Sequence, residues 1–315
     1  MKKISLGISS CLLGNQVRYD GGHKLEPFMT NTLGMFVDWV PVCPEVECGL
    51  PVPREPMRLV GDPKTPRLVT IRTTVDHTAR MSRWAKKKIA ELQTMDLCGF
   101  VFKSRSPSSG MRGVKIYDEA GRSHTTDSGL FAKAFMDTFP LLPVEDEDRL
   151  HDPGLRDNFI ERVFVYERWQ EYTKKDGSLG GLVSFHTNHK LLVMAHSLKH
   201  YRELGKLVAS AKQVAKKELR KRYVRTLMEG LQYLATVKKN TNVLQHIAGY
   251  FKDLLSSGEK KELQDIIEHY HQGLVPLIVP ITLLQHYTRR FDEEYLKQQY
   301  YLNPHPLELM LRNHA

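Results

Sequence analysis

Short apolar runs alternate with segments of helical length through the first half of this chain. The runs predict strands at 4–9, 37–42, 67–72 and 97–103, with a shorter strand at 114–117. The other segments predict helices at about 24–35, 77–94 and 128–138. Strands that are separated by helices usually pair in parallel, as βαβ units. The first half is therefore expected to form an α/β domain around a largely parallel sheet.

The second half has a different pattern, which is helical nearly throughout from about residue 155. Predicted helices lie at 155–174, 182–195, 198–211, 214–236, 240–256, 259–272, 279–288 and 292–300. Before them, the stretch from Pro140 to Asp148 combines prolines with an acidic run, which indicates either a linker or a turn into the next domain. We therefore expect an α/β domain over 1–148 and an all-α domain over 149–315.

Two cysteines follow predicted strand ends directly. Cys11 comes after the strand at 4–9 and Cys43 after the strand at 37–42, and the polar segment 103–110 follows the strand at 97–103. Ligands of such sheets bind in the crevice beyond the carboxyl ends of the strands. We expect these three segments to face one crevice.

The chain has four cysteines in 315 residues, and the third of them, Cys48, lies five residues after Cys43. Cys98 sits in an apolar run and is predicted to be a buried core residue. A signal peptide and a bilayer-spanning run are both missing from the pattern, which predicts a cytoplasmic protein without membrane contact. In a reducing compartment, clustered cysteines are typical of metal-binding or catalytic sites. Three thiols fit a structural zinc site poorly, because such sites take four ligands, whereas a 4Fe–4S cluster on three thiolates keeps one iron open.

Three motifs connect the first half to a known family. They are Ser9-Ser10-Cys11-Leu12-Leu13-Gly14 with Arg18-Tyr19-Asp20-Gly21, then Cys43-Pro44-Glu45 with Gly49-Leu50-Pro51 and Pro53-Arg54, and finally Lys103-Ser104-Arg105-Ser106-Pro107-Ser108-Ser109-Gly110. With these motifs, residues 4–140 resemble the thiouracil desulfidase family. The resemblance implies a 4Fe–4S cluster on three cysteines and removal of sulfur, as sulfide, from a thiolated nucleobase. Residues 155–313 resemble the YbgA-like helical domain, for which the resemblance implies no function.

The third motif departs from the family at one position. The family commonly has Ser-Pro-Ser-Cys-Gly, whose cysteine is the expected third cluster ligand, and Ser109 stands there in this chain. A hydroxyl is less acidic than a thiol and its hard oxygen suits cluster iron badly. Because Cys48 occupies a place where the family has other residues, we expect a ligand exchange that makes the metal set Cys11, Cys43 and Cys48. The alternative is that the cluster is lost and the domain has become non-catalytic.

Candidate catalytic residues lie in the second and third motifs. The resemblance implies that the glutamate of Cys-Pro-Glu is catalytic, and Glu45 has the chemistry to move a proton or activate water. Its structural alternative is a favourable charge at a helix N-terminus. The family also implicates a serine in the third motif, where we expect Ser104 first and then Ser106 to contact substrate or water; otherwise they cap a turn.

Substrate contacts are expected from polar and aromatic side chains in the same motifs. The guanidinium groups of Arg54, Arg105 and Arg112 have donor pairs for a carbonyl or phosphate, unless they simply pair with acids. Tyr19 has a ring that can stack on a base, although a core or rim position explains it equally, and Ser109 has a hydroxyl for the same crevice.

Positive charge is concentrated in the second half. Residues 1–148 hold 20 basic and 18 acidic side chains, a net charge of +2, and residues 149–315 hold 26 and 18, a net charge of +8. This distribution indicates either RNA binding or a solvated helix face. Nine of the fourteen histidines lie between residues 186 and 305, and the spacing of His189, His196 and His200 places them on one helix face. Hydrogen-bonded histidines between helices explain them better than a metal pocket does.

The function that follows is desulfidation of a thiouracil-like nucleobase by hydrolysis, with sulfide leaving through the open iron of a 4Fe–4S cluster. The alternative is an RNA- or tRNA-binding protein in which the metal cluster is structural or senses a signal. A zinc-stabilised module is a third possibility. Turnover of free thiouracil would distinguish the desulfidase from the RNA-binding protein.

Overall fold

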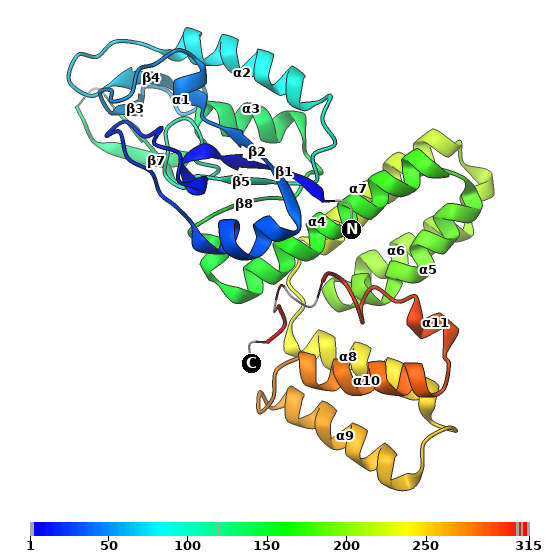
Figure 1. Ribbon diagram of the computed structural model, residues 1–315. Helices are drawn as coiled ribbons and strands as arrows, with labels where there is room; N and C mark the ends of the chain where they lie inside the picture. Colours follow the sequence, from blue (N-terminus) through cyan, green and yellow to red (C-terminus); the bar gives the residue numbers. More distant parts are fainter. Residues whose placement is uncertain (1–2, 119, 307–308, 310, 314–315) are drawn as a thin grey trace. The chain divides into compact units, whose positions relative to one another are not determined.

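The computed structural model describes residues 3–118, 120–306, 309 and 311–313. The chain divides into two compact units, residues 1–152 and 153–315. The first contains all the strands among the described residues, and the second is helical (Figure 1). The fold prediction, an α/β part with a largely parallel sheet followed by an all-α part, is therefore confirmed.

A four-stranded parallel sheet forms the centre of the first unit. Its strands are, in spatial order, β2 (Val37–Val42), β1 (Ile4–Ser9), β5 (Phe100–Phe102) and β8 (Val144–Asp146). All three neighbouring pairs run parallel. The central strands are almost completely buried, which explains their continuous apolar runs. This arrangement brings four strand ends to one edge.

A second sheet of four strands was not expected as a separate element. Its order is β4 (Arg67–Thr70), β3 (Met57–Val60), β6 (Val114–Tyr117) and β7 (Ser123–Asp127). The predicted strand at 67–72 belongs here, antiparallel to β3, and not to the parallel sheet. β3 escaped prediction because it is short and has Arg58 among its apolar residues, and β7 because its sequence, Ser-His-Thr-Thr-Asp, has no apolar residue.

The acidic segment at the expected domain boundary is a strand of the parallel sheet. β8 pairs with β5 through Phe100–Val144 and Phe102–Asp146. The prediction of a linker at 140–148 is therefore wrong. Acidic side chains are tolerated in this buried strand because Glu145 accepts hydrogen bonds from Arg112 at 3.2 Å and Arg149 at 2.9 Å.

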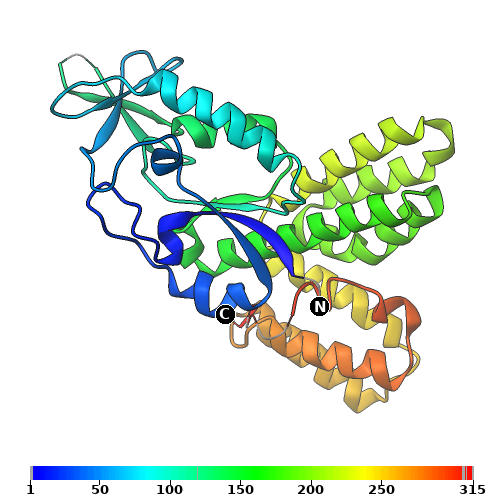
Figure 2. The same cartoon turned by 45° about the horizontal axis from the view of Figure 1, so that its top comes forward.

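Two helices cover one face of the parallel sheet, α2 (Thr78–Leu92) and α3 (Leu130–Thr138), close to the predicted ranges (Figures 1 and 2). They pack through aromatic rings, with Phe131 at 5.3 Å from Trp84 and 6.0 Å from Phe100 between ring centroids. The expected helix at 24–35 is reduced to a π-helical turn at Phe28–Thr32 and a 3-10 turn at Leu33–Met35. Thr30 there bonds to the backbone with its hydroxyl, which competes with regular helix.

The second unit contains eight helices within the described residues. They are α4 (Pro153–Lys175), α5 (Leu179–His196), α6 (Leu198–Ala209), α7 (Lys216–Leu231), α8 (Val237–Ala248), α9 (Ser257–His271), α10 (Ile278–Arg290) and α11 (Glu294–Lys297). Hydroxyl side chains cap four of the N-termini, at Ser178, Ser197, Thr236 and Ser256. α11 has one turn, in contrast to the predicted 292–300. In the part of the chain that is described, none of the helices has the length and apolar character needed to cross a membrane.

Candidate functional site

Four segments that follow the ends of the parallel strands line one cavity of about 640 Å³. A 3-10 turn at Ser10–Leu13 follows β1, and the helix α1 (Pro44–Glu47) follows β2 after Cys43. Residues 103–109 follow β5, and Glu147 and Asp148 follow β8. The expected convergence of strand ends on one crevice is confirmed.

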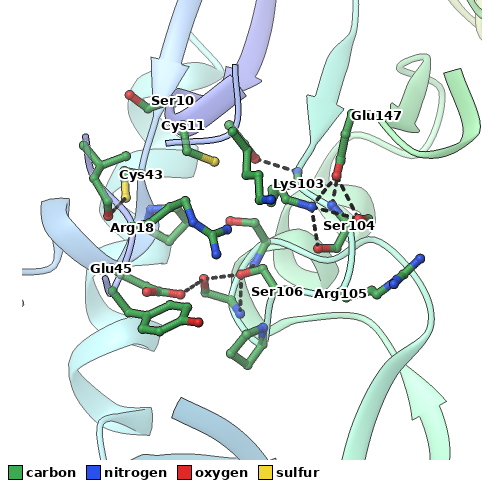
Figure 3. Close-up of a pocket in the computed structure, with 18 of the residues that line it drawn as sticks. Ser10, Cys11, Arg18, Cys43, Glu45, Lys103, Ser104, Arg105, Ser106 and Glu147 are labelled. Carbon is green, nitrogen blue, oxygen red and sulfur yellow. Dashed lines mark hydrogen bonds and ion pairs between the residues drawn. The ribbon is translucent and has the colours of Figure 1, made fainter. Parts of the chain in front are cut away.

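Cys11 and Cys43 both line this cavity (Figure 3). The turn that holds Cys11 is fixed by its carbonyl, which accepts hydrogen bonds from the amides of Lys24 at 2.9 Å and Gly14 at 3.3 Å. Gly14 has a φ of 88°, a conformation that favours glycine. The amide of Cys43 donates to Glu47 at 2.8 Å. Burial raises the pKa of Cys11 to about 11 and also raises the pKa of Cys43, so both thiols are neutral near pH 7.

Cys48 is not brought to this cavity. It terminates α1, and its side chain packs against the buried core of the second sheet, formed by Leu59, Leu68, Met81, Val114 and Ile116. Its sulfur lies 3.2 Å from the carbonyl oxygen of Glu45. The three thiols of the expected metal set therefore do not meet, because Cys43 and Cys48 stand at opposite ends of α1 and Cys48 packs against the second sheet.

Ser109, in contrast, lines the cavity together with Cys11 and Cys43 and is almost completely buried. A cluster on three cysteines does not fit this donor set, since the third side chain supplied by the strand ends is a hydroxyl. Consistent with this, the described residues contain no group of three or more His, Cys, Asp or Glu side chains arranged to hold a metal ion.

Glu45 is the best-positioned acid in the cavity. One of its oxygens accepts from Nε of Arg54 at 2.8 Å and also pairs with Nη2 of the same guanidinium. Its other oxygen, Oε1, accepts from the hydroxyl of Ser108 at 2.8 Å. The Ser108 hydroxyl is also 3.0 Å from that of Ser106. All these partners orient the carboxylate, whose side chain keeps an exposed fraction of 14%.

Arg54 is fixed beside Glu45 by its contacts with backbone carbonyls. Its amide donates to the carbonyl of Tyr19 at 2.8 Å, and its Nη2 donates to the carbonyl of Val17 at 3.0 Å. The expected role of Arg54 in direct substrate contact stays a prediction, but its ion pair with Glu45 explains its burial. Ser108, which completes the contact, was missed by sequence reasoning although it belongs to the same serine-rich motif.

A second charged group lies across the cavity, formed by Lys103, Ser104 and Glu147 (Figure 3). Glu147 pairs with Nζ of Lys103 and accepts from the amide of Ser104 at 2.7 Å and its hydroxyl at 2.8 Å. Ser104 is thus tied to Glu147, and also to Asp148 at 2.9 Å. Glu147 was missed because the acidic run was interpreted as a domain boundary.

The remaining predicted site residues differ in their placement. Tyr19 lines the rim of the cavity, where the guanidinium of Arg18 lies 5.4 Å from its ring centroid. Arg105 also lines the rim, but its side chain is 82% exposed and points away toward Asp148 (Figure 3). Arg112 does not line the cavity; it pairs with Glu145 of β8.

The histidines of the helical unit have separate partners. His189 stacks on Phe185 at 3.9 Å between ring centroids, His196 contacts Glu161 at 3.0 Å, and His200 contacts Ser197 at 2.7 Å. Burial lowers the pKa of His189 to about 3, so it packs as a neutral ring. A hydrogen bond between helices is confirmed for His196, whose partner Glu161 belongs to α4. It is wrong for His189, whose Nδ1 contacts the Phe185 carbonyl of its own helix at 2.7 Å, and for His200, whose partner Ser197 caps its own helix. The three also do not share one helix face, because His200 lies in α6 and the other two lie in α5.

Comparison with known proteins identifies both parts of the chain. Residues 6–147 match the model of the 2-thiouracil desulfurase family, and residues 190–306 match DUF1722, a family described as proteins of unknown function. The uncharacterized protein YbgA of Escherichia coli (strain K12) is 29% identical over 158 residues, which cover 50% of this chain and 94% of YbgA. The solved structure of the 4Fe–4S-dependent thiouracil desulfidase TudS is 30% identical with a TM-score of 0.39, and the match covers 50% of this chain and 97% of that one. The chain therefore combines a part that matches the 2-thiouracil desulfurase family with a YbgA-like DUF1722 part after it.

Proposed function

We propose that the first unit is a desulfidase that replaces the sulfur of a thiolated, thiouracil-like nucleobase with oxygen. The observation that carries this proposal is the arrangement of Glu45 in one cavity with the thiols of Cys11 and Cys43. The match of residues 6–147 to the 2-thiouracil desulfurase model supports it, as does the 30% sequence identity to TudS, a thiouracil desulfidase. The volume of the cavity is sufficient for a pyrimidine ring.

The proposed reaction is a hydrolysis without a net redox change. Water adds to the carbon of the C=S group, the C–S bond breaks, and the products are a carbonyl and hydrogen sulfide. Glu45 takes the proton from water, since each of its contacts within the described residues comes from a donor and leaves it the acceptor. Arg54 and Ser108 hold this carboxylate in place.

The thiol of Cys11 acts on the departing sulfur. Because burial raises its pKa, Cys11 presents a neutral S–H group, which is a donor for a sulfur that gains negative charge, whereas the Cys43 thiol donates to the carbonyl oxygen of Val17 at 3.8 Å. In TudS a 4Fe–4S cluster is required, and such a cluster supplies a Lewis-acidic iron when bound. In this chain the third side chain beside Cys11 and Cys43 is the Ser109 hydroxyl, which is a poor ligand for such an iron.

The test is anaerobic incubation of the full chain with 2-thiouracil or 4-thiouracil, with sulfide and uracil measured together. We expect equal amounts of both products, and a rate at least about 100-fold lower for Glu45→Gln, the usual size of a general-base contribution. Glu91→Gln is the matched control, because Glu91 is an exposed glutamate of α2 outside the cavity. Absence of sulfide with both thiobases, or an unchanged rate in Glu45→Gln, contradicts the proposal.

We also propose, as a second function, that the helical unit binds RNA. The observation that favours it is a set of exposed cations along α7. They are Lys216, Lys217, Lys221, Arg222 and Arg225. Their charges are available to phosphates, and the free energy of such contacts depends on counterion release.

Binding of labelled tRNA to the full chain at several salt concentrations tests this second proposal. We expect the affinity to fall steeply with salt, and to fall further in Lys217→Glu/Lys221→Glu, which reverses two charges one turn apart. Lys260→Glu/Lys261→Glu makes the same charge change on exposed positions of α9. Equal weakening in both double variants indicates general electrostatics and contradicts a site on α7.

A further inference from the structure

We infer that Ser109, and not Cys48, occupies the third donor position of the cavity, so that the native chain presents two thiols and does not retain a 4Fe–4S cluster on three protein ligands. Ser109→Cys replaces the hydroxyl oxygen with sulfur and gives the cavity three thiols. This inference concerns the metal content of the cavity and does not depend on the proposed substrate.

Three adjacent strands of the parallel sheet each supply one donor side chain to the cavity. Cys11 follows β1, Cys43 follows β2 and Ser109 lies in the segment after β5, and all three line the same cavity. The cavity therefore receives one donor from each of three adjacent strands of the parallel sheet. Within the described part of the chain, no hydrogen bond is formed by the Ser109 hydroxyl, which leaves it free to be replaced by a thiol.

The backbone at Ser109 is fixed on both sides. The amide of Ser109 donates to the Ser106 hydroxyl at 3.1 Å, and the amide of Gly110 donates to the Ser106 carbonyl at 2.8 Å. A Cβ on Gly110 would lie 2.8 Å from that carbonyl oxygen, and a Cβ on Gly129 would lie 2.5 Å from the carbonyl carbon of Ser108. Close packing of this kind holds Ser109 in place, so Ser109→Cys changes the donor atom and leaves its position.

Cys48 cannot serve as the third donor of the cavity, because of its place at the end of α1. Cys43 precedes α1 and Cys48 follows it, so the two thiols stand at opposite ends of a one-turn helix. The amide of Cys48 donates to the Pro44 carbonyl at 3.1 Å, and the amide of Leu50 donates to the Glu45 carbonyl at 3.1 Å. These bonds fix the end of α1 while the Cys48 side chain packs against the core of the second sheet. To reach the cavity, Cys48 would have to leave that core and unwind α1.

The side chains present in the cavity have a low affinity for a 4Fe–4S cluster. Iron–sulfur clusters are held by thiolates, and soft ligands are strongly preferred over hydroxyls by such centres. With thiols from Cys11 and Cys43 alone, two irons of a cubane would lack the protein thiolate that a cluster normally has. We therefore expect poor retention in the native chain.

The experiment measures iron and acid-labile sulfide per chain after anaerobic reconstitution of the full protein and gel filtration, together with the visible spectrum. We expect less than about one iron in the native chain and about four irons with four sulfides in Ser109→Cys. Cys48→Ser is expected to change neither result, in the native or in the Ser109→Cys background. Cys98→Ser is the matched control for removal of a buried thiol elsewhere, and Cys11→Ser in the Ser109→Cys background is expected to abolish loading.

Three outcomes overturn the inference. They are a stable cluster with about four irons in the native chain, loss of iron caused by Cys48→Ser, and failure of Ser109→Cys to gain iron while its thermal unfolding matches that of the native chain. If Ser109→Cys does not fold, the iron content of the native chain and of Cys48→Ser still decides the matter. Sulfide release is measured separately, so a native chain that releases no sulfide refutes the proposed function and leaves this inference standing.

Discussion

At the scale of single residues, the cavity is organised around carboxylates that face hydrogen-bond donors. Glu45 contacts Arg54 and Ser108, and Glu147 contacts Lys103 and Ser104. Cys11 and Cys43 were predictable because each follows a strand end closely, and Glu45 was predictable from the family resemblance of the Cys43-Pro44-Glu45 motif. Ser108 and Glu147 were not predictable in the same way, since their roles depend on side chains that are 63 and 43 or more positions away. Spacing in the sequence does not show which way Cys48 points either.

The hydrogen bond from Ser108 to Glu45 leads to a prediction on catalysis. In Ser108→Ala, Oε1 of Glu45 loses its 2.8 Å donor, and a hydrogen bond to a charged group is worth about 1.5–3 kcal/mol. We expect kcat for sulfide release to fall by about 10- to 100-fold while KM changes less. Steady-state kinetics on a thiobase measure this, with Ser82→Ala on the exposed face of α2 as the control. A variant whose KM alone changes would show that Ser108 contacts substrate and does not orient Glu45.

At the scale of elements, the long apolar strands and the helices could be predicted, and the short mixed strands could not. β1 and β2 have six residues each and are bounded by cysteine-containing turns. β8 has three residues, two of them acidic, and is stabilised as a strand by its pairing with β5 and by the arginines that contact Glu145. Such tertiary contacts override the local preference of the segment.

Close packing between β1 and the aromatic cluster leads to a prediction on stability. A Cβ on Gly7 would lie 2.1 Å from the ring of Phe100, which stacks on Phe102 at 4.3 Å between centroids. Both rings are fully buried, so we expect Gly7→Ala to lower the free energy of unfolding by about 1–3 kcal/mol. Urea denaturation followed by fluorescence measures the change.

Gly205 is the matched control for this substitution. It lies inside α6, and a Cβ there meets no heavy atom within 4 Å. Because alanine favours helix over glycine, Gly205→Ala is expected to stabilise the chain by up to about 1 kcal/mol. An unfolding midpoint that Gly7→Ala leaves unchanged would mean that β1 and β5 separate easily at this point.

At the scale of the whole molecule, each unit has its own buried network of charges. In the first unit this network lines the cavity. In the second, Glu161 of α4 pairs with Arg312, which also donates to the carbonyl of Tyr301 at 2.7 Å. Burial alone would raise the pKa of Glu161, but Arg312 and the hydrogen bond from His196 lower it below its ordinary value of 4.5. The last segment of the chain is thus tied to the first helix of its unit.

This depressed pKa predicts how acid affects the helical unit. A carboxylate whose pKa is lower in the folded state stabilises that state at pH values above about 4.5, and this contribution is lost as the pH falls further. Arg312→Met leaves Glu161 buried without its cation, so we expect a loss of about 3–5 kcal/mol near pH 7. The double variant Glu161→Gln/Arg312→Met removes both charges, and we expect it to recover most of this loss and to depend less on pH. Circular dichroism at 222 nm during urea unfolding, between pH 3 and 7, measures both effects. If the single and double variants are equally unstable and equally sensitive to acid, the ion pair is not what ties the chain end to α4.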